Sequence, residues 1–168
     1  MVFILLAGCQ AAKAPSDLAS TTRDRERPTE VVAIEPPDPE TLSARGLPPP
    51  PEQFVPAPRL ADIHFDYDAY TVRPEDTRVL DGNAAWLRTN PDGLVLIEGH
   101  ADERGTSEYN LGLGDLRAAA AMGYLIARGI PAERMVAISY GKERPACIEH
   151  NEACWARNRR ARFLVKPL

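Results

Sequence analysis

The stretch Leu94–Arg117, LVLIEGHADERGTSEYNLGLGDLR, contains the signals that decide the fold. It begins with a short apolar run, Leu94–Ile97, which is bounded by turn residues and therefore predicts a buried strand. A charged loop follows, and then a helix with Thr106 or Ser107 as its N-cap. Glu108 would lie in the first turn, where a carboxylate complements the helix dipole. The stretch thus predicts a strand, a loop and a helix in succession.

Upstream of this unit, Ile63, Phe65 and Tyr67 alternate with polar residues, which predicts a strand with one apolar face. Pro74 suits the first turn of a helix. Residues at helical spacing then supply its packing face: Val79, Leu80, Asn83, Ala84 and Leu87. The turn residues Asn90–Gly93 end this helix before the buried strand begins.

Downstream, the central helix is predicted to continue to about residue 128, with Gly129 at the C′ position and Pro131 just beyond. Its packing face is expected to comprise Ala118–Ala121, Met122, Leu125 and Ile126. The remaining elements are a strand over Met135–Tyr140, a short helix over 151–157 and a last strand over Ala161–Val165. This β-α-β-α-β-(α)-β order predicts an α/β (α+β) two-layer sandwich with a mixed sheet.

The N-terminal third has a different composition. Residues 10–58 contain eleven of the sixteen prolines and few aromatic residues, so we expect a Pro-rich disordered linker there. In polyproline II form, at roughly 3.1 Å per residue, such a linker reaches about 150 Å. The predicted folded domain, 59–168, carries 15 basic and 16 acidic side chains. This near-neutral balance gives no electrostatic footprint for nucleic acid.

The first nine residues, MVFILLAGC, end in Leu6–Cys9, which matches the lipobox of bacterial lipoproteins. We therefore expect 1–9 to be the remnant of a signal peptide and Cys9 to be the lipidated residue. The apolar part is short and no Lys or Arg precedes it, so the start lies upstream or the chain has been trimmed. Gln10, in place of Asp after the cysteine, indicates sorting to the outer membrane. No other segment is long and apolar enough to span a bilayer.

The central unit also carries a candidate binding site. Asn110, Leu113 and Arg117 lie at i, i+3 and i+7 of the predicted helix, so they share the face that rises from the loop with Asp102. A carboxylate can take an ammonium, and a guanidinium can take a carboxylate in bidentate fashion, so the pair suits a zwitterion. A solvated surface pair of an Asp and an Arg remains the alternative.

Two cysteines remain if Cys9 is lipidated. In an oxidising compartment Cys147 and Cys154 would form a disulfide that stabilises the fold by about 2–3 kcal/mol. The alternative is a metal site, since Cys147, His150 and Cys154 form C-x2-H-x3-C. That pattern offers three ligands where a structural zinc needs four, so the disulfide is favoured and no metal is expected.

The sequence does not indicate an enzyme. His100 adjoins the key loop, but no Ser or Cys nucleophile and no clearly paired carboxylate accompanies it, so we expect a structural histidine and no catalytic residue. Arg159 and Arg160 are expected to make internal salt bridges rather than a basic patch.

The motif G-H-A-D-E-R-G-T-x-E-Y-N-x-x-L-G-x-x-R-A, which starts at Gly99, resembles the signature of the OmpA-like peptidoglycan-binding domain. Within that family it is most similar to the peptidoglycan-associated lipoprotein (Pal) branch. The resemblance extends from Ile63 to about Val165, and it includes the segments Phe65–Asp68, Ser139–Ala146 and Asn158–Ala161.

The resemblance implies the same fold, and binding of the diaminopimelate residue of peptidoglycan stem peptides without cleavage and without a cofactor. That residue ends in an ammonium and a carboxylate. By the resemblance, Asp102 and Arg117 match the principal ligand contacts. Supporting positions around the pocket match Asp68, Asn110 and Leu113. Leu116 is a departure, since relatives often have a second Arg there.

The resemblance further implies a lipoprotein of a Gram-negative outer membrane that faces the periplasm and tethers the membrane to the cell wall. TolB and the other Tol-Pal proteins would be its partners in envelope integrity and cell division. Two alternatives remain: a general OmpA-like lipoprotein without a Tol role, and an enzyme that acts on the wall.

Overall fold

The computed structural model describes residues 49–166. Cys9 and most of the predicted linker therefore lie outside the described residues. The strands are β1 (Val55–Pro56), β2 (Ile63–His64), β3 (Leu94–His100), β4 (Met135–Gly141) and β5 (Arg160–Lys166), and the helices are α2 (Thr77–Thr89), α3 (Ser107–Ala127) and α4 (Glu152–Asn158). Short 3-10 turns lie at η1 (Pro51–Gln53), η2 (Pro74–Asp76) and η3 (Ala132–Arg134). Within this range no helix is both long and apolar enough to cross a bilayer.

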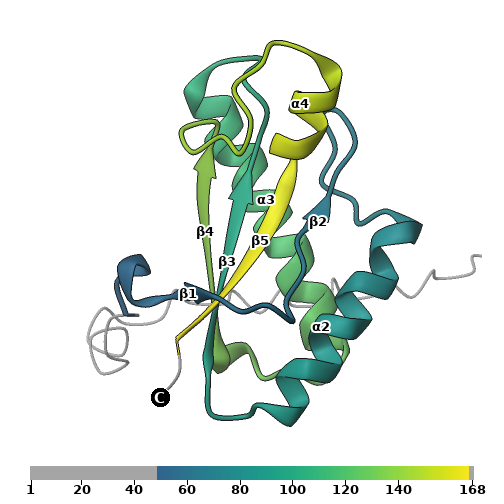
Figure 1. Ribbon diagram of the computed structural model, residues 1–168, viewed down its shortest axis with the longest axis vertical. Helices are drawn as coiled ribbons and strands as arrows, with labels where there is room; N and C mark the ends of the chain where they lie inside the picture. The colour runs from purple at the N-terminus through teal and green to yellow at the C-terminus, as the bar shows by residue number, and fades with distance from the viewer. Residues whose placement is uncertain (1–48, 167–168) are drawn as a thin grey trace, which may run out of the picture. The chain divides into compact units, whose positions relative to one another are not determined.

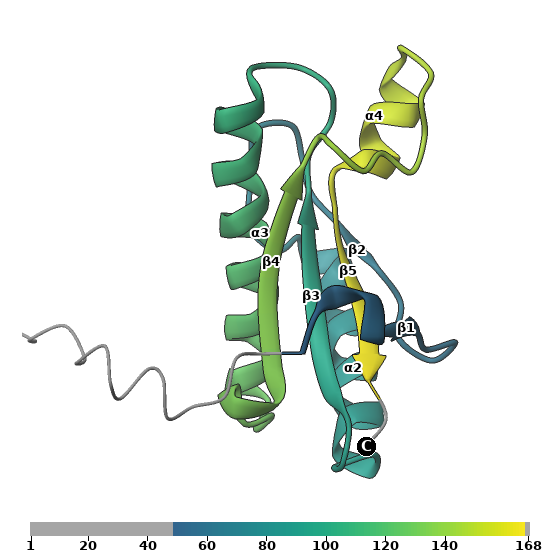
Figure 2. The same ribbon diagram turned by 90° about the vertical axis from the view of Figure 1, so that its left-hand side faces the viewer.

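The five strands form one mixed sheet in the order β1-β5-β3-β4, with β2 also paired to β5. β3 and β4 are parallel, while β5 is antiparallel to β1, β2 and β3. The main strands lie side by side with α3 behind them (Figure 1), and the view from the side shows α3 along one face of the sheet (Figure 2). The predicted two-layer α/β architecture with a mixed sheet is confirmed.

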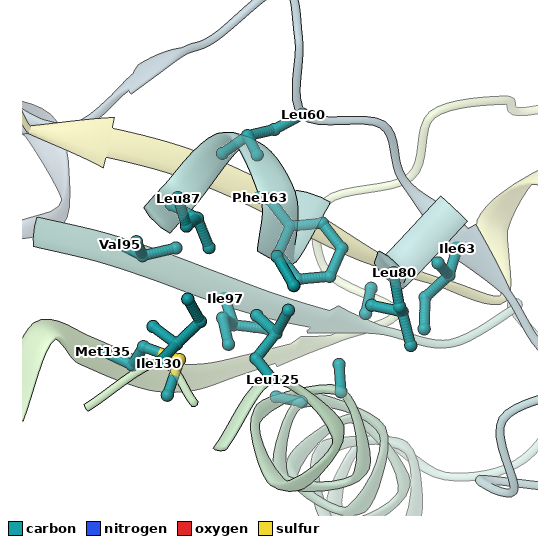
Figure 3. Close-up of a cluster of buried hydrophobic side chains, with 14 of the residues drawn as sticks. Leu60, Ile63, Leu80, Leu87, Val95, Ile97, Leu125, Ile130, Met135 and Phe163 are labelled. Carbon is teal, nitrogen blue, oxygen red and sulfur yellow. The ribbon is translucent and has the colours of Figure 1, made fainter. Parts of the chain in front are cut away.

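The hydrophobic core lies between this face of the sheet and the two long helices. Figure 3 shows side chains from α2, α3 and the strands meeting there, among them Leu80, Leu125, Val95 and Phe163. All four are at most 2% exposed. Alternate residues of β3 point to the other face, where Leu96 packs with Phe54 and Leu164 in a smaller cluster.

The ends of α3 follow the sequence signals closely. The Thr106 side chain accepts a hydrogen bond from the backbone N–H of Tyr109 at 3.2 Å, as an N-cap does. At the other end Gly129 has a φ of +87°. The Ile130 N–H bonds the Leu125 carbonyl and the Gly129 N–H bonds the Ile126 carbonyl, which is a Schellman motif. The predicted start and stop of this helix are confirmed.

α3 crosses β3 at very short range, and two glycines allow it. A Cβ on Gly99 would lie 1.8 Å from the Gly114 carbonyl oxygen, and one on Gly114 would lie 2.1 Å from the Ser139 side-chain oxygen. Because these two residues have no side chain, the helix approaches the sheet closely enough to bring Arg117 beneath the end of β3.

Two details of the predicted elements are wrong. The first strand ends at His64, and Tyr67 is 62% exposed, because the chain turns at Asp66–Ala69 with Asp68 at φ +53°. On α3 the apolar face is narrower than expected: Ala118, Ala121 and Leu125 are buried, whereas Ile126 is 45% exposed. Small alanines give a helix little periodic signal with which to place its buried stripe.

Described elements of the folded domain also precede residue 59, the predicted domain boundary. Val55 and Pro56 pair with β5, and Phe54 is only 6% exposed. Prolines dominate this segment, and Pro is tolerated at the edge of a sheet, so composition alone conceals a two-residue edge strand.

Candidate functional site

The candidate site lies at the end of β3, in the loop that leads into α3. Asp102 is the second residue after the strand and is 4% exposed. The preceding residue is held by a hydrogen bond from the Ala101 N–H to the Gly141 carbonyl at 2.8 Å. The Asn110 side chain, 2% exposed, donates to the carbonyls of Arg104 and Thr106, which closes the loop onto the first turn of α3. The loop is therefore fixed by the strand and helix that it joins.

Asp102 is paired with two arginines. Its carboxylate accepts hydrogen bonds from the Arg104 backbone N–H and Nε, each at 3.1 Å, and from Arg104 Nη2 at 2.7 Å. Arg159 Nη1 lies 3.3 Å away on the buried side. Burial raises the pKa of Asp102, but the hydrogen bonds from Arg104 and Arg159 outweigh it and hold the pKa below its usual value. Asp102 is thus a stable carboxylate.

Arg104 is the partner that faces solvent, and its side chain is 31% exposed. Its guanidinium lies between two aromatic rings, 4.0 Å from the centre of Tyr67 and 4.3 Å from that of Trp155. Aromatic faces attract cations, so the rings and Asp102 together form a site for a positive charge. In this structure the protein's own arginine fills that site.

Arg117 lies on the other side of the loop and has no exposed surface. It donates to three backbone carbonyls: Ala69 at 2.9 Å, His100 at 2.8 Å and Asp66 at 3.2 Å. Burial lowers its pKa to about 10, and neighbouring carboxylates such as Asp102 offset part of that effect. It therefore stays protonated at neutral pH. Because both Asp102 and Arg117 are buried, the alternative of a solvated surface pair is wrong.

The supporting positions have different roles. Asp68 is exposed and accepts a hydrogen bond from the Tyr109 hydroxyl, which raises the pKa of Tyr109. Asp68 and Leu113 line a surface pocket of about 620 Å³ together with Tyr70, Tyr109 and other residues of α3. Asn110 does not line this pocket and acts on the loop instead.

α4 and the preceding loop form the outer wall of the site. Cys147 and Cys154 are joined by a disulfide with their Cα atoms 5.3 Å apart, so neither sulfur is free to ligate a metal. His150 Nδ1 lies 2.7 Å from the Glu103 carboxylate, and the Trp155 indole donates to it at 2.8 Å. Both contacts lower the pKa of Glu103. These contacts hold the wall against the loop.

Sequence reasoning missed Arg104, which contacts Asp102 directly, and Trp155, which packs against Arg104. Arg104 and Trp155 were not singled out, although Arg104 lies inside the motif that identified the loop. Trp155 is more than fifty residues from its partners, and nothing in its local pattern indicates the contact. Arg159 makes the internal salt bridges expected for it, to Asp102 and, at 2.7 Å, to Glu152.

Comparison with known proteins agrees with the family that the sequence motif resembles. The model of the OmpA family matches residues 64–159. A peptidoglycan-associated lipoprotein of Rhizobium meliloti (strain 1021) is 52% identical over 99 residues, which cover 59% of this chain and 56% of the relative. The match thus spans little more than half of the relative's length.

Solved structures agree with the fold. The crystal structure of the peptidoglycan-associated lipoprotein from Burkholderia pseudomallei is 43% identical, with a TM-score of 0.60 over 62% of this chain and 88% of that one. The cell wall anchor of the T6SS from Pseudomonas aeruginosa is 30% identical, with a TM-score of 0.54 over 62% and 75%.

Proposed function

The chain belongs to the OmpA family, and we propose that it is an outer-membrane lipoprotein that binds the diaminopimelate residue of peptidoglycan without cleaving it. The observation that carries the proposal is the buried Asp102 carboxylate, covered by the partly exposed Arg104, in a domain similar to proteins named peptidoglycan-associated lipoproteins. The protein would tether the outer membrane to the cell wall from the periplasmic side.

The ammonium of the ligand is proposed to take the place of Arg104 on Asp102. Both groups are monocations, so the exchange leaves the charge of the buried site unchanged and Asp102 never loses its partner. The rings of Tyr67 and Trp155 would then face the incoming ammonium. Arg104 has a path to leave because its side chain is partly exposed.

The carboxylate of the ligand is proposed to pair with the released Arg104, with Arg117 as the second cation. The three hydrogen bonds of Arg117 use three of its five N–H donors. Since Arg117 has no exposed surface, direct contact with a ligand requires the turn Asp66–Tyr70 to move away. The left-handed Asp68 and the exposed Tyr67 and Tyr70 lie in this turn. Asp68 and Leu113 would line the ligand pocket, and Asn110 would hold the loop that carries Asp102.

In the proposed anchor, a lipid holds the protein in the outer membrane and the binding site attaches it to the wall. Acylation of Cys9 and a proline-rich linker would hold the domain at the distance of the wall. Charge-assisted hydrogen bonds contribute about 1.5–3 kcal/mol each. Many tethered copies facing one polymeric sheet would then hold firmly although each site is weak.

Cosedimentation with purified diaminopimelate-type peptidoglycan tests the proposal. The full chain, made without lipid by the Cys9→Ser change, should sediment with the wall. Asp102→Asn should bind about ten- to a hundredfold more weakly, because about 1.5–3 kcal/mol is lost. The matched control is Asp92→Asn, an exposed carboxylate in the turn at the opposite end of β3, which should bind as the parent chain does. Equal sedimentation of both variants would refute the assigned site, and release of soluble fragments would support the enzyme alternative instead.

A Tol role is a separate part of the proposal. If the protein is the Pal component, TolB should be captured by the Cys9→Ser chain. Failure to capture TolB while the chain still binds peptidoglycan would favour a general OmpA-like lipoprotein.

A further inference from the structure

A second pocket lies on the face of the sheet opposite α2 and α3. Its volume is about 420 Å³. β3 contributes Glu98 and His100, β5 contributes Arg160 and Arg162, and Asp62 and the segment Arg144–Ala146 complete the lining. None of the side chains assigned to the candidate site lines it. His100 is shared only through its backbone, since its carbonyl bonds Arg117 on the helical side.

Two buried side chains in this pocket have hydrogen-bonding atoms without a protein partner. His100 is 2% exposed, and neither of its ring nitrogens makes a hydrogen bond to another described residue. The nearest carboxylate oxygen, on Glu98, is 3.5 Å from Nε2. Arg160 is 7% exposed, and its Nη1 is likewise unpartnered. Buried donors of this kind are rare in folded proteins and call for a ligand or an internal partner.

The charges of the pocket do not balance. Three guanidinium groups, those of Arg144, Arg160 and Arg162, face two carboxylates, and the ion pairs between them are long: 3.8 Å from Arg160 to Asp62 and 3.7 Å from Arg162 to Glu98. His100 adds no charge at neutral pH, because burial lowers its pKa. One further negative charge would make the pocket neutral.

The pocket is also open to a ligand from solvent. Arg144 is exposed and stacks on the ring of Tyr140, 3.7 Å from its centre. The side chain of Arg162 is 39% exposed. The entrance is therefore formed by two cations, and the inner wall by His100 and Arg160.

From this geometry we infer a binding site for a peptide carboxylate, formed by His100, Arg144, Arg160 and Arg162 on the face of the sheet opposite the helices. A guanidinium fork matches the two oxygens of a carboxylate. A phosphate dianion would exceed the single missing charge and lie against Glu98 and Asp62. A metal ion would meet three guanidinium groups, and residues 49–166 contain no cluster of three or more His, Cys, Asp or Glu side chains that could hold one. The carboxylate comes from a free C-terminus or from an Asp or Glu side chain of a partner protein.

NMR titration of the full Cys9→Ser chain tests the inference, with the His100 ring and the Arg160 Nε–H as reporters. Acetyl-alanyl-alanine should cause saturable shifts of both, and its C-terminal amide should cause none. The His100 pKa should rise in the complex, since a carboxylate stabilises the protonated ring. Acetyl-aspartyl-methylamide distinguishes the sources: tighter binding of this probe assigns a side chain, and weaker binding assigns a C-terminus.

The side chains of Arg144 and Arg162 reach solvent at the entrance, so replacing them tests the site without disturbing the fold. Arg162→Gln and Arg144→Gln should each weaken carboxylate binding about tenfold, the loss of one charge-assisted hydrogen bond. Arg157→Gln, an exposed arginine of α4, should bind as the parent chain does. Asp102→Asn should also leave carboxylate binding unchanged, so failure of the proposed peptidoglycan site would be distinguishable from failure here. Equal shifts with the amide, tighter binding of inorganic phosphate, or no saturable shift with any carboxylate would overturn the inference.

Discussion

Two regions of the fold use buried groups in opposite ways. Where α2 and α3 pack on the strands, the interior is apolar, with Leu80, Leu125 and Phe163 almost fully buried. At the C-terminal end of β3 the interior is charged. Asp102, in the loop after the strand, and Arg117, on α3, are both buried there. Hydrophobic burial stabilises the first region, whereas the second requires every charge to have partners. We therefore expect the first region to set stability and the second to set binding.

The largest expected effect is in the apolar region. Leu125→Ala removes a side chain with no exposed surface and should lower the free energy of unfolding by about 2–5 kcal/mol. Urea denaturation measures this loss. The folded fraction should keep the affinity of the parent chain for peptidoglycan, and a matched drop in affinity would mean that the two regions are not separable.

Arg117 lies where the two regions meet, so its replacement should affect both stability and binding. Arg117→Met leaves the carbonyls of Ala69, His100 and Asp66 without their donor, at a cost to stability of about 1–3 kcal/mol. Binding should also be lost. Arg117→Lys keeps the charge and serves as the control. If Arg117→Met unfolds like the parent chain, then the guanidinium does not hold the turn.

Sequence patterns describe the apolar region well and the charged region only in outline. Thr106 and Gly129 predicted the ends of α3, because caps are local signals. The motif also predicted that Asp102 and Arg117 would share one end of the fold. Their burial, and the position of Arg104 between Tyr67 and Trp155, depend on contacts between segments far apart in the chain. No periodicity encodes such contacts.

Arg104→Gln should lower stability by about 1–3 kcal/mol, because the buried Asp102 carboxylate keeps only Arg159 as its cationic partner. Affinity for diaminopimelate should also fall, because the cation proposed to receive the ligand carboxylate is gone. Thermal unfolding and cosedimentation, performed on the same preparations, separate the two effects. Unchanged affinity would show that Arg104 only covers Asp102.

The smallest effect is on the pH dependence of stability. Burial lowers the pKa of His100 below its ordinary value of 6.5, and that of His64 likewise. The unfolded chain thus binds protons near pH 6.5 that the folded chain does not. Stability should be fully present above that pH and should fall as the pH drops below it. Urea midpoints between about pH 8 and about pH 5 measure this slope, and His100→Gln should reduce it. An identical slope in His100→Gln would assign the pH dependence to other groups.

The proposed binding mode requires a ligand ammonium to replace Arg104 on Asp102, and NMR of the Arg104 Nε–H reports this exchange. The Cys9→Ser chain would be titrated with a stem peptide that contains diaminopimelate and, separately, with the peptide that contains lysine in its place. We predict that the diaminopimelate peptide binds more tightly and shifts the Arg104 signal as its bond to Asp102 breaks. Binding that leaves this signal unchanged, or equal affinity for the two peptides, would show that the ammonium does not replace Arg104.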